Sequence, residues 1–243
     1  MFPDSRQERL AQLEEETTYC RLCPRLVEWR EKIAREKKAA HAGEEYWGHP
    51  VPGFGDPEAR VVVFGLAPAA HGANRTGRYF TGDRSGDFLF GALHRTGFAN
   101  TPVSRRVDDG LRLSGLWISA AVRCAPPKNK PTPAERDACL PYAARELGLL
   151  SDARVLVCLG AFAWDAALRL HAVRPKPRFA HGGEHAPSSG PILLGCYHPS
   201  QQNTFTGVLT EPMLDAVLLR ASWQSEKTGS VKPANAGTGR EGP

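Results

Sequence analysis

Four short runs of apolar residues recur along the chain, and none of them alternates with polar residues. They lie at residues 60–66, 116–122, 154–159 and 192–197. A strand with one face in water shows a period of two, whereas a continuous apolar run is typical of a strand buried on both faces. The pattern therefore predicts four parallel strands inside a covered sheet.

Helix-compatible segments separate and flank these runs. The clearest begins at Thr132, where Thr132-Pro133-Ala134-Glu135 combines a capping box with proline at the first helical position. We expect this helix to run to about Leu147, where Gly148 can end it. Further helices are predicted near residues 6–16, 26–38, 85–97, 160–170 and 211–223.

Strands that alternate with helices predict an α/β protein, a three-layer α/β/α sandwich around a central, mainly parallel four-stranded sheet. Ligands of such sheets bind beyond the carboxyl ends of the strands, so we expect the chemistry just after each strand. From residue 224 onward the composition turns to Gly, Pro, Ser, Thr and Lys, which have little to bury. We therefore expect a single domain over residues 1–223 and a disordered tail over residues 224–243.

The composition is that of a soluble globular protein and does not by itself indicate a function. The chain has 243 residues, 41% of them hydrophobic and 23% charged, which suits a soluble protein with an apolar core. Residues 1–16 are rich in Arg and Glu, and no apolar stretch is long enough to cross a bilayer. We therefore expect a cytoplasmic protein with no membrane partner. The net charge of +5 suits a polyanion such as nucleic acid but does not demand one.

The segments that follow the predicted strands hold most of the polar residues that could form a site. The longest spans residues 66–83. Its small residues let backbone amides approach a ligand, and Arg75 and Arg78 could contact phosphates, as could Arg84, Lys128 and Lys130. The alternative is that any α/β protein needs glycine and proline where strands turn into helices. The length of the segment favours a pocket-forming loop.

Three side chains at this edge of the sheet could carry chemistry. Asp83 stands at the start of a helix, where it could cap that helix, act on water or stabilise a positive charge. A lone histidine is more often a packing or surface residue, but the position of His198 after the last strand favours a role in a site. Asn129 follows the second strand, and its alternative role is to cap a turn between Pro127 and Pro131.

The six cysteines divide into two groups. Cys158 and Cys196 fall inside predicted strands, where free thiols act as small core residues. The others, at a C-x2-C and a C-x14-C spacing, are Cys20, Cys23, Cys124 and Cys139. In a cytosolic chain they indicate metal ligation rather than disulfides. Zinc sites generally use two tight pairs, and four thiolates from distant segments fit a [4Fe–4S] cluster at least as well, so spacing leaves the metal open.

Two segments resemble the motifs of a known family. The first is Gly65-Leu66-Ala67-Pro68-Ala69-Ala70-His71-Gly72 with Gly77-Arg78-Tyr79-Phe80-Thr81-Gly82-Asp83, and the second is His198-Pro199-Ser200-Gln201-Gln202-Asn203-Thr204-Phe205-Thr206-Gly207. Together they are similar to the motifs of the family 5, or type B, iron–sulfur uracil-DNA glycosylases, and the resemblance extends to about Trp223. Family 4 enzymes carry an acidic residue in place of Leu66 and an asparagine in place of Ala120, so the chain resembles family 5 more closely.

This resemblance implies a uracil-DNA glycosylase-like fold and a monofunctional enzyme of DNA base excision repair. Such an enzyme hydrolyses the N-glycosidic bond of uracil, and in some relatives of other deaminated or modified bases, to leave an abasic site. The resemblance also implies a structural [4Fe–4S] cluster on the four outlying cysteines and uracil-containing DNA, single- or double-stranded, as the partner. We expect the protein to be a monomer. The alternative is a non-catalytic iron–sulfur protein that binds DNA with the same fold.

The resemblance also implies roles for individual residues. The catalytic residues would be Asp83, His198 and Asn129. The residues that surround the base would be Gly65, Ala67, Ala69 and Phe80. The residues that contact the DNA would be Arg75, Arg78, Gln202 and Asn203. Phe80 would stack on the flipped base, and its alternative is a place in the core. An ester hydrolase is excluded, because no G-x-S-x-G turn follows any strand.

Overall fold

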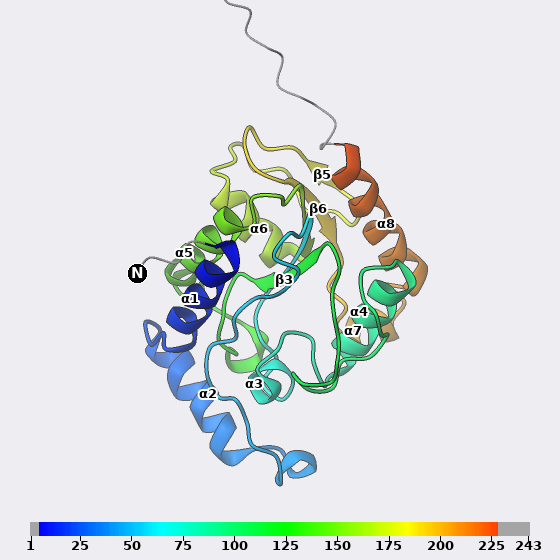
Figure 1. Cartoon of the computed structure of the whole chain (residues 1–243). Coiled ribbons are helices and arrows are strands. Elements are labelled where there is room, and N and C mark those ends of the chain that lie inside the picture. Colours follow the sequence, from blue (N-terminus) through cyan, green and yellow to red (C-terminus); the bar gives the residue numbers. More distant parts are fainter. Residues whose placement is uncertain (1–4, 228–243) are drawn as a thin grey trace, which may run out of the picture.

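Four parallel strands form the centre of a six-stranded sheet (Figure 1). The computed structural model describes residues 5–227. The parallel strands are β2 (Val61–Gly65), β3 (Leu116–Ala120), β4 (Val155–Leu159) and β6 (Ile192–Cys196). Two short strands, β1 (Phe54–Gly55) and β5 (Glu184–His185), pair antiparallel at the edges and complete the order β1-β3-β2-β4-β6-β5. The four predicted strands are confirmed, and the edge strands escape prediction because two residues show no periodicity.

Helices cover both faces of the sheet, so the α/β/α sandwich is confirmed (Figure 1). One layer contains α4 (Arg84–Arg95) and α8 (Glu211–Lys227), and the other contains α1 (Arg6–Thr18), α5 (Pro133–Leu149) and α6 (Ala161–Leu170). In β2, Val61 and Val63 pack into the first layer, whereas Val62 and Phe64 pack into the second. This alternation explains why a strand needs apolar residues at every position.

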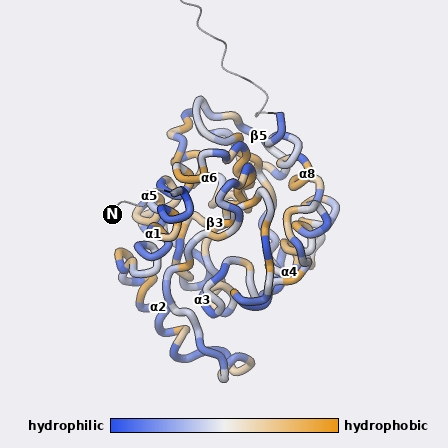
Figure 2. Tube along the Cα trace, viewed as in Figure 1, coloured by the Kyte–Doolittle hydropathy of each residue, from blue (hydrophilic) through white to orange (hydrophobic). Residues whose placement is uncertain are grey.

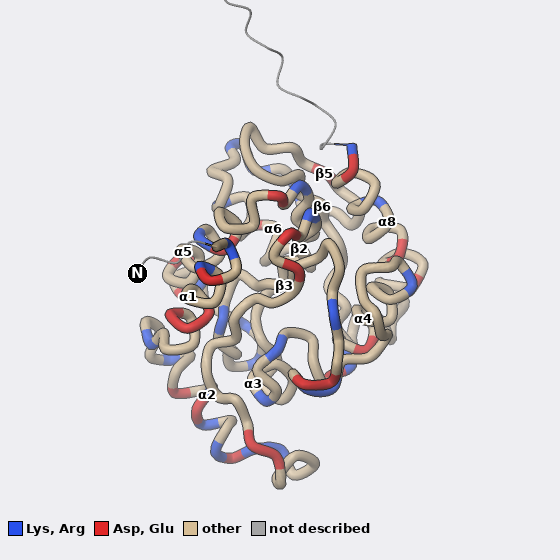
Figure 3. The backbone as a smooth tube through the Cα atoms, in the orientation of Figure 1, with Lys and Arg blue, Asp and Glu red and all other residues tan. Residues whose placement is uncertain are grey.

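The distribution of polarity follows these layers. Hydrophobic residues gather along the central strands (Figure 2). The four parallel strands contain no Lys, Arg, Asp or Glu, and charges of both signs lie on the surrounding helices and loops (Figure 3). None of the helices within residues 5–227 combines the length and the apolar composition that crossing a membrane requires.

The remaining helices are short or lie beside the carboxyl ends of the parallel strands. They are α2 (Pro24–Glu36), α3 (Ala73–Thr76) and α7 (Gln201–Phe205), with 3-10 turns η1 (Ala39–His41) and η2 (Pro127–Asn129). The sequence predicts α2 but neither α3 nor α7, since one turn of helix leaves no pattern.

Two predicted boundaries are wrong. The helix α5 continues through Gly148 to Leu149, so that glycine does not end it. The helix α8 reaches Lys227, so residues 224–227 are helical and do not belong to a disordered tail, because Ser225 still packs at a buried position. The rest of the predicted tail, residues 228–243, lies outside the described residues.

A buried ion pair joins the segment after β3 to α5. Arg123 and Glu146 are 2% and 4% exposed, and the guanidinium of Arg123 donates to both carboxylate oxygens of Glu146, at 3.2 and 2.7 Å. The hydroxyl of Ser119 donates to the same carboxylate. Cys124 follows Arg123 directly and Cys139 lies two turns before Glu146 on α5. The pair therefore fixes the distance between these two cysteines.

We expect Glu146→Gln to lower the free energy of unfolding by about 3 kcal/mol or more, because it leaves the Arg123 guanidinium buried without a counter-charge. The matched control is Glu16→Gln, which breaks an exposed pair with Arg145 and should cost at most about 1 kcal/mol. Urea unfolding followed by circular dichroism measures both. Equal losses in the two variants would contradict this assignment.

Candidate active site

A cavity of about 560 Å³ opens at the carboxyl ends of the parallel strands. The strand order places the first parallel strand, β2, between the second, β3, and the third, β4. Such a reversal of strand order leaves a crevice beyond the strand ends, where ligands of α/β proteins bind. The residues that line the cavity include Ala67, Ala69, Asp83, Asn129, His198 and Gln202. All three predicted catalytic side chains therefore border one space.

Asp83 caps a helix and also lines the cavity. Its Oδ1 accepts a hydrogen bond from the N–H of Gly86 at 2.9 Å and so caps α4. Its Oδ2 lies against Gly72, where a Cβ atom would come within 2.0 Å of it. Burial raises the pKa of Asp83 above its ordinary value. The cap thus orients a carboxylate that also lines the cavity.

His198 follows β6 and lies beside the end of β4. A Cβ atom on Gly160 would be 3.5 Å from the Cβ of His198. The carbonyl of His198 accepts hydrogen bonds from the side-chain amide of Asn203, at 2.9 Å, and from the N–H of Ser200, at 2.8 Å. Among the described residues nothing hydrogen-bonds to its imidazole, and burial lowers its pKa to about 4. At neutral pH the ring can therefore donate one N–H to a ligand.

Asn129 also lines the cavity, in a turn that backbone hydrogen bonds close without its side chain. The N–H groups of Asn129 and Lys130 donate to the carbonyls of Pro126 and Pro127, at 3.2 and 3.1 Å. The side-chain amide of Asn129 forms no hydrogen bond within the part of the chain that the structure describes, and the residue is exposed. The side chain of Asn129 therefore does not cap this turn, and its amide is available to a ligand.

Phe80 and Gly65 lie next to the cavity and do not line it. The ring of Phe80 would be 3.5 Å from a Cβ on Gly65, and its centroid is 6.1 Å from that of the His198 ring. Phe80 also packs against the buried core, in the left-handed backbone region with φ of 54°. Non-glycine residues adopt this region rarely, and such strain concentrates at functional sites. Stacking of Phe80 on a ligand stays a prediction.

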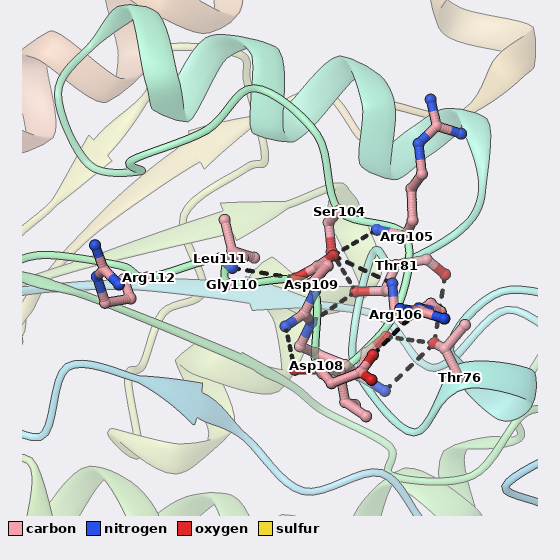
Figure 4. A network of polar contacts seen from close by, with 12 residues as sticks. Thr76, Thr81, Ser104, Arg105, Arg106, Asp108, Asp109, Gly110, Leu111 and Arg112 are labelled. Atoms are coloured by element: carbon pink, nitrogen blue, oxygen red, sulfur yellow. Dashed lines mark hydrogen bonds and ion pairs between the residues drawn. The ribbon is translucent and has the colours of Figure 1, made fainter.

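Arg75 and Arg78 do not reach the surface as phosphate contacts would. They are 8% and 7% exposed. Arg75 pairs with Glu44, and Arg78 donates to Asp109 at 2.7 Å and to Ser104 at 2.8 Å. Ser104 and Asp109 belong to the network of polar contacts in Figure 4. Both guanidinium groups are thus used inside the protein, and DNA contacts by these two residues stay a prediction. Each carboxylate partner lies 31 residues away in the sequence, so no local pattern reveals it.

The rim of the cavity is formed largely by α7 and the start of α4. Gln202 is exposed and lines the cavity, as expected of a residue near DNA. Asn203 instead directs its side chain inward to His198 and acts as a positioning residue. The guanidinium of Arg84 lies 5.3 Å from the centroid of the exposed ring of Phe205. The sequence analysis did not single out Phe205. The feature that could have indicated it is a large apolar residue in an otherwise polar segment.

The four outlying cysteines line one narrow cavity between α2, α5 and the segment after β3: Cys20, Cys23, Cys124 and Cys139. Burial raises the pKa of Cys124 to about 11 and that of Cys139 to about 12. Within residues 5–227 no three His, Cys, Asp or Glu side chains gather closely enough to hold a single metal ion. Cys158 and Cys196 are buried free thiols inside strands, as predicted.

Several known proteins similar to this chain are named type-5 uracil-DNA glycosylase. The family model described as "Uracil DNA glycosylase superfamily" matches residues 52–221 of this chain. A "Type-5 uracil-DNA glycosylase" of Mycobacterium tuberculosis is 58% identical over 83% of this chain and 76% of that protein. Proteins of the same name from Thermus thermophilus and Mycobacterium leprae are 55% and 54% identical, over 84% and 86% of this chain and 93% and 92% of those proteins. The chain belongs to the uracil-DNA glycosylase superfamily, within its type-5 family.

We expect NMR titration of the imidazole signals to show His198 neutral at pH 6, with a midpoint near 4. His198→Gln assigns the signal by removing it. Because the folded pKa lies below the unfolded value of about 6.5, the protein loses stability as the pH falls from there toward 4, and His198→Gln should lose less over the same range. A midpoint at or above the ordinary value would contradict the assignment.

Proposed function

We propose that this protein hydrolyses the bond between uracil and deoxyribose in DNA and leaves an abasic site, as a monofunctional glycosylase. The observation that carries the proposal is the single cavity bordered by Asp83, Asn129 and His198 in a chain of this superfamily. Its volume of about 560 Å³ lies within the usual range for small-molecule sites. A base inside a duplex is out of reach, so the nucleotide swings out at a cost of a few kcal/mol.

Departure of the base leaves negative charge on uracil and positive charge on the sugar. Groups that meet these charges stabilise the transition state more than the ground state. The neutral imidazole of His198 donates to a base oxygen, and the ionised Asp83 carboxylate stabilises the sugar cation and orients the attacking water. Its partial burial strengthens this interaction, because charges attract more strongly where water is excluded. Asn129 supplies a further hydrogen bond to the water or the base.

The other residues of the site bind and position the nucleotide. Ala67 and Ala69 have small side chains at the cavity wall, which lets the backbone approach the base. Phe80 stacks on the flipped base from beside His198, and Gly65 lies next to its ring. Gln202 contacts the DNA at the rim, and Asn203 holds the His198 segment in place.

The four outlying cysteines hold a [4Fe–4S] cluster with a structural role. A four-iron cluster binds each thiolate at a different iron, so its ligands lie farther apart than those of one zinc ion. Four cysteines that line one cavity support the cluster. The cluster links α2, α5 and the segment after β3. Residues 5–227 act as one domain and as a monomer, on single- or double-stranded DNA in the cytoplasm.

An oligonucleotide with one uracil tests the reaction, since alkali breaks the strand at an abasic site. We expect wild-type protein to produce that break. Asp83→Asn and His198→Gln should slow it by orders of magnitude while DNA binding survives. The first removes the charge that stabilises the sugar cation, and the second replaces the imidazole N–H with an amide placed differently toward the base oxygen. The control is Asp87→Asn, an exposed carboxylate one turn into α4.

Three outcomes contradict these assignments. Binding without strand breakage by the wild-type protein would favour a non-catalytic DNA-binding protein. Wild-type rates in Asp83→Asn or His198→Gln would remove that residue from the catalytic set. A loss of activity in Asp87→Asn equal to that in Asp83→Asn would show a general charge effect on α4.

Anaerobically purified protein should show the broad visible absorption of an iron–sulfur cluster, with iron and acid-labile sulfide in equal amounts. We expect Cys139→Ser to lose this absorption and Cys158→Ser to keep it, because Cys158 lies inside β4 and does not line the cavity of the four outlying cysteines. Stoichiometric zinc without sulfide in the wild-type protein would refute the cluster.

A further inference from the structure

Arg30, on α2, places a buried guanidinium against the cysteine cavity. It is 1% exposed. Its Nη1 donates to Sγ of Cys124 at 3.0 Å and to the carbonyl of Cys20 at 3.2 Å. Its Nε has no hydrogen-bond partner among the residues described. The guanidinium therefore faces two of the four outlying cysteines directly.

Within residues 5–227, no carboxylate forms a close ion pair with Arg30. The nearest recorded one, on Glu31, is 3.9 Å from Nη2 and accepts a shorter bond of 2.5 Å from Arg21. The other buried arginines of the described chain each have a carboxylate within 2.7 Å, and they are Arg75, Arg78, Arg123 and Arg136. A buried charge without a partner costs several kcal/mol. A negative charge in the cysteine cavity would therefore stabilise the buried guanidinium of Arg30.

The backbone of Arg30 is also anchored on the side of the active-site loop. Its carbonyl accepts a hydrogen bond of 3.2 Å from the side-chain amide of Asn74, which is fully buried on α3. Since α3 belongs to the segment between β2 and Asp83, α2 is fixed between that loop and the cysteines. This bond holds the helix backbone at Arg30 in place, and the guanidinium itself is buried against the cysteines.

We propose that Arg30 is the internal counter-ion of the iron–sulfur cluster, and that its positive charge both retains the cluster and raises the reduction potential of the cluster. This inference rests on the cofactor of the proposed function. Four thiolates carry more negative charge than the iron–sulfur core carries positive charge. An added electron increases that excess, so a fixed cation and an N–H···S bond stabilise the reduced form more than the oxidised form.

The test compares variants of the full-length, anaerobically purified protein. Spectroelectrochemistry gives the midpoint potential for one-electron reduction, and the fading of the visible absorption in an iron chelator gives the rate of cluster loss. We expect Arg30→Met to have a lower potential and faster fading than wild type, and Arg30→Lys to recover most of both. The matched control is Arg21→Met, which removes the same charge close to Cys20 from a side chain that is 62% exposed, and should change neither.

Several results would overturn the proposal. One is an Arg30→Met potential equal to that of wild type, and another is an equal shift in Arg21→Met. If Arg30→Met holds no cluster, the comparison of Arg30→Lys with Arg30→Gln decides, because only lysine keeps the charge. Equal cluster content in those two variants would show that charge is not the property required. A wild-type protein without iron would instead refute the cofactor, whatever its rate of uracil excision.

Discussion

The parallel pairing of four wholly apolar strands is the constraint on which the molecule depends. Because the strands run the same way, their carboxyl ends meet at one edge, and the segments after β2, β3 and β6 enclose a common space there. Helices on both faces bury the strands and force the polar residues into those segments. The same constraint directs Cys124 to the end of β3, where α2 and α5 bring the other cysteines.

Sequence reasoning succeeded where one residue class repeats along the chain and failed where partners lie far apart. Continuous apolar runs predicted β2, β3, β4 and β6 within one or two residues, and their direction placed Asp83 and His198 at one edge. Helices of a single turn leave no periodicity, so α3 and α7 were not foreseen. The inward direction of Asn203 depends on a carbonyl that only the folded turn brings near.

The arginines illustrate that limit most clearly. In a basic chain, an arginine in a pocket loop suggests contact with an anionic ligand. Arg75 and Arg78 bind carboxylates and carbonyls of their own protein instead, and they stiffen the loop that carries Asp83. Arg84, one residue beyond Asp83, does face the cavity. The sequence predicted phosphate contacts for Arg75, Arg78 and Arg84 alike. Only their partners in the folded protein distinguish the two buried arginines from Arg84.

Gly72 is a position where the neighbouring carboxylate of Asp83 explains why the residue is glycine. Its φ is negative, so left-handed backbone is not the reason for glycine at this position. Any β-carbon there would overlap the Oδ2 atom of Asp83, which makes the absence of a side chain a spatial requirement of the carboxylate. A homologue with alanine at this point must have shifted or lost its acid. The residue at this position is therefore a diagnostic for shared chemistry, even where the aspartate itself is present.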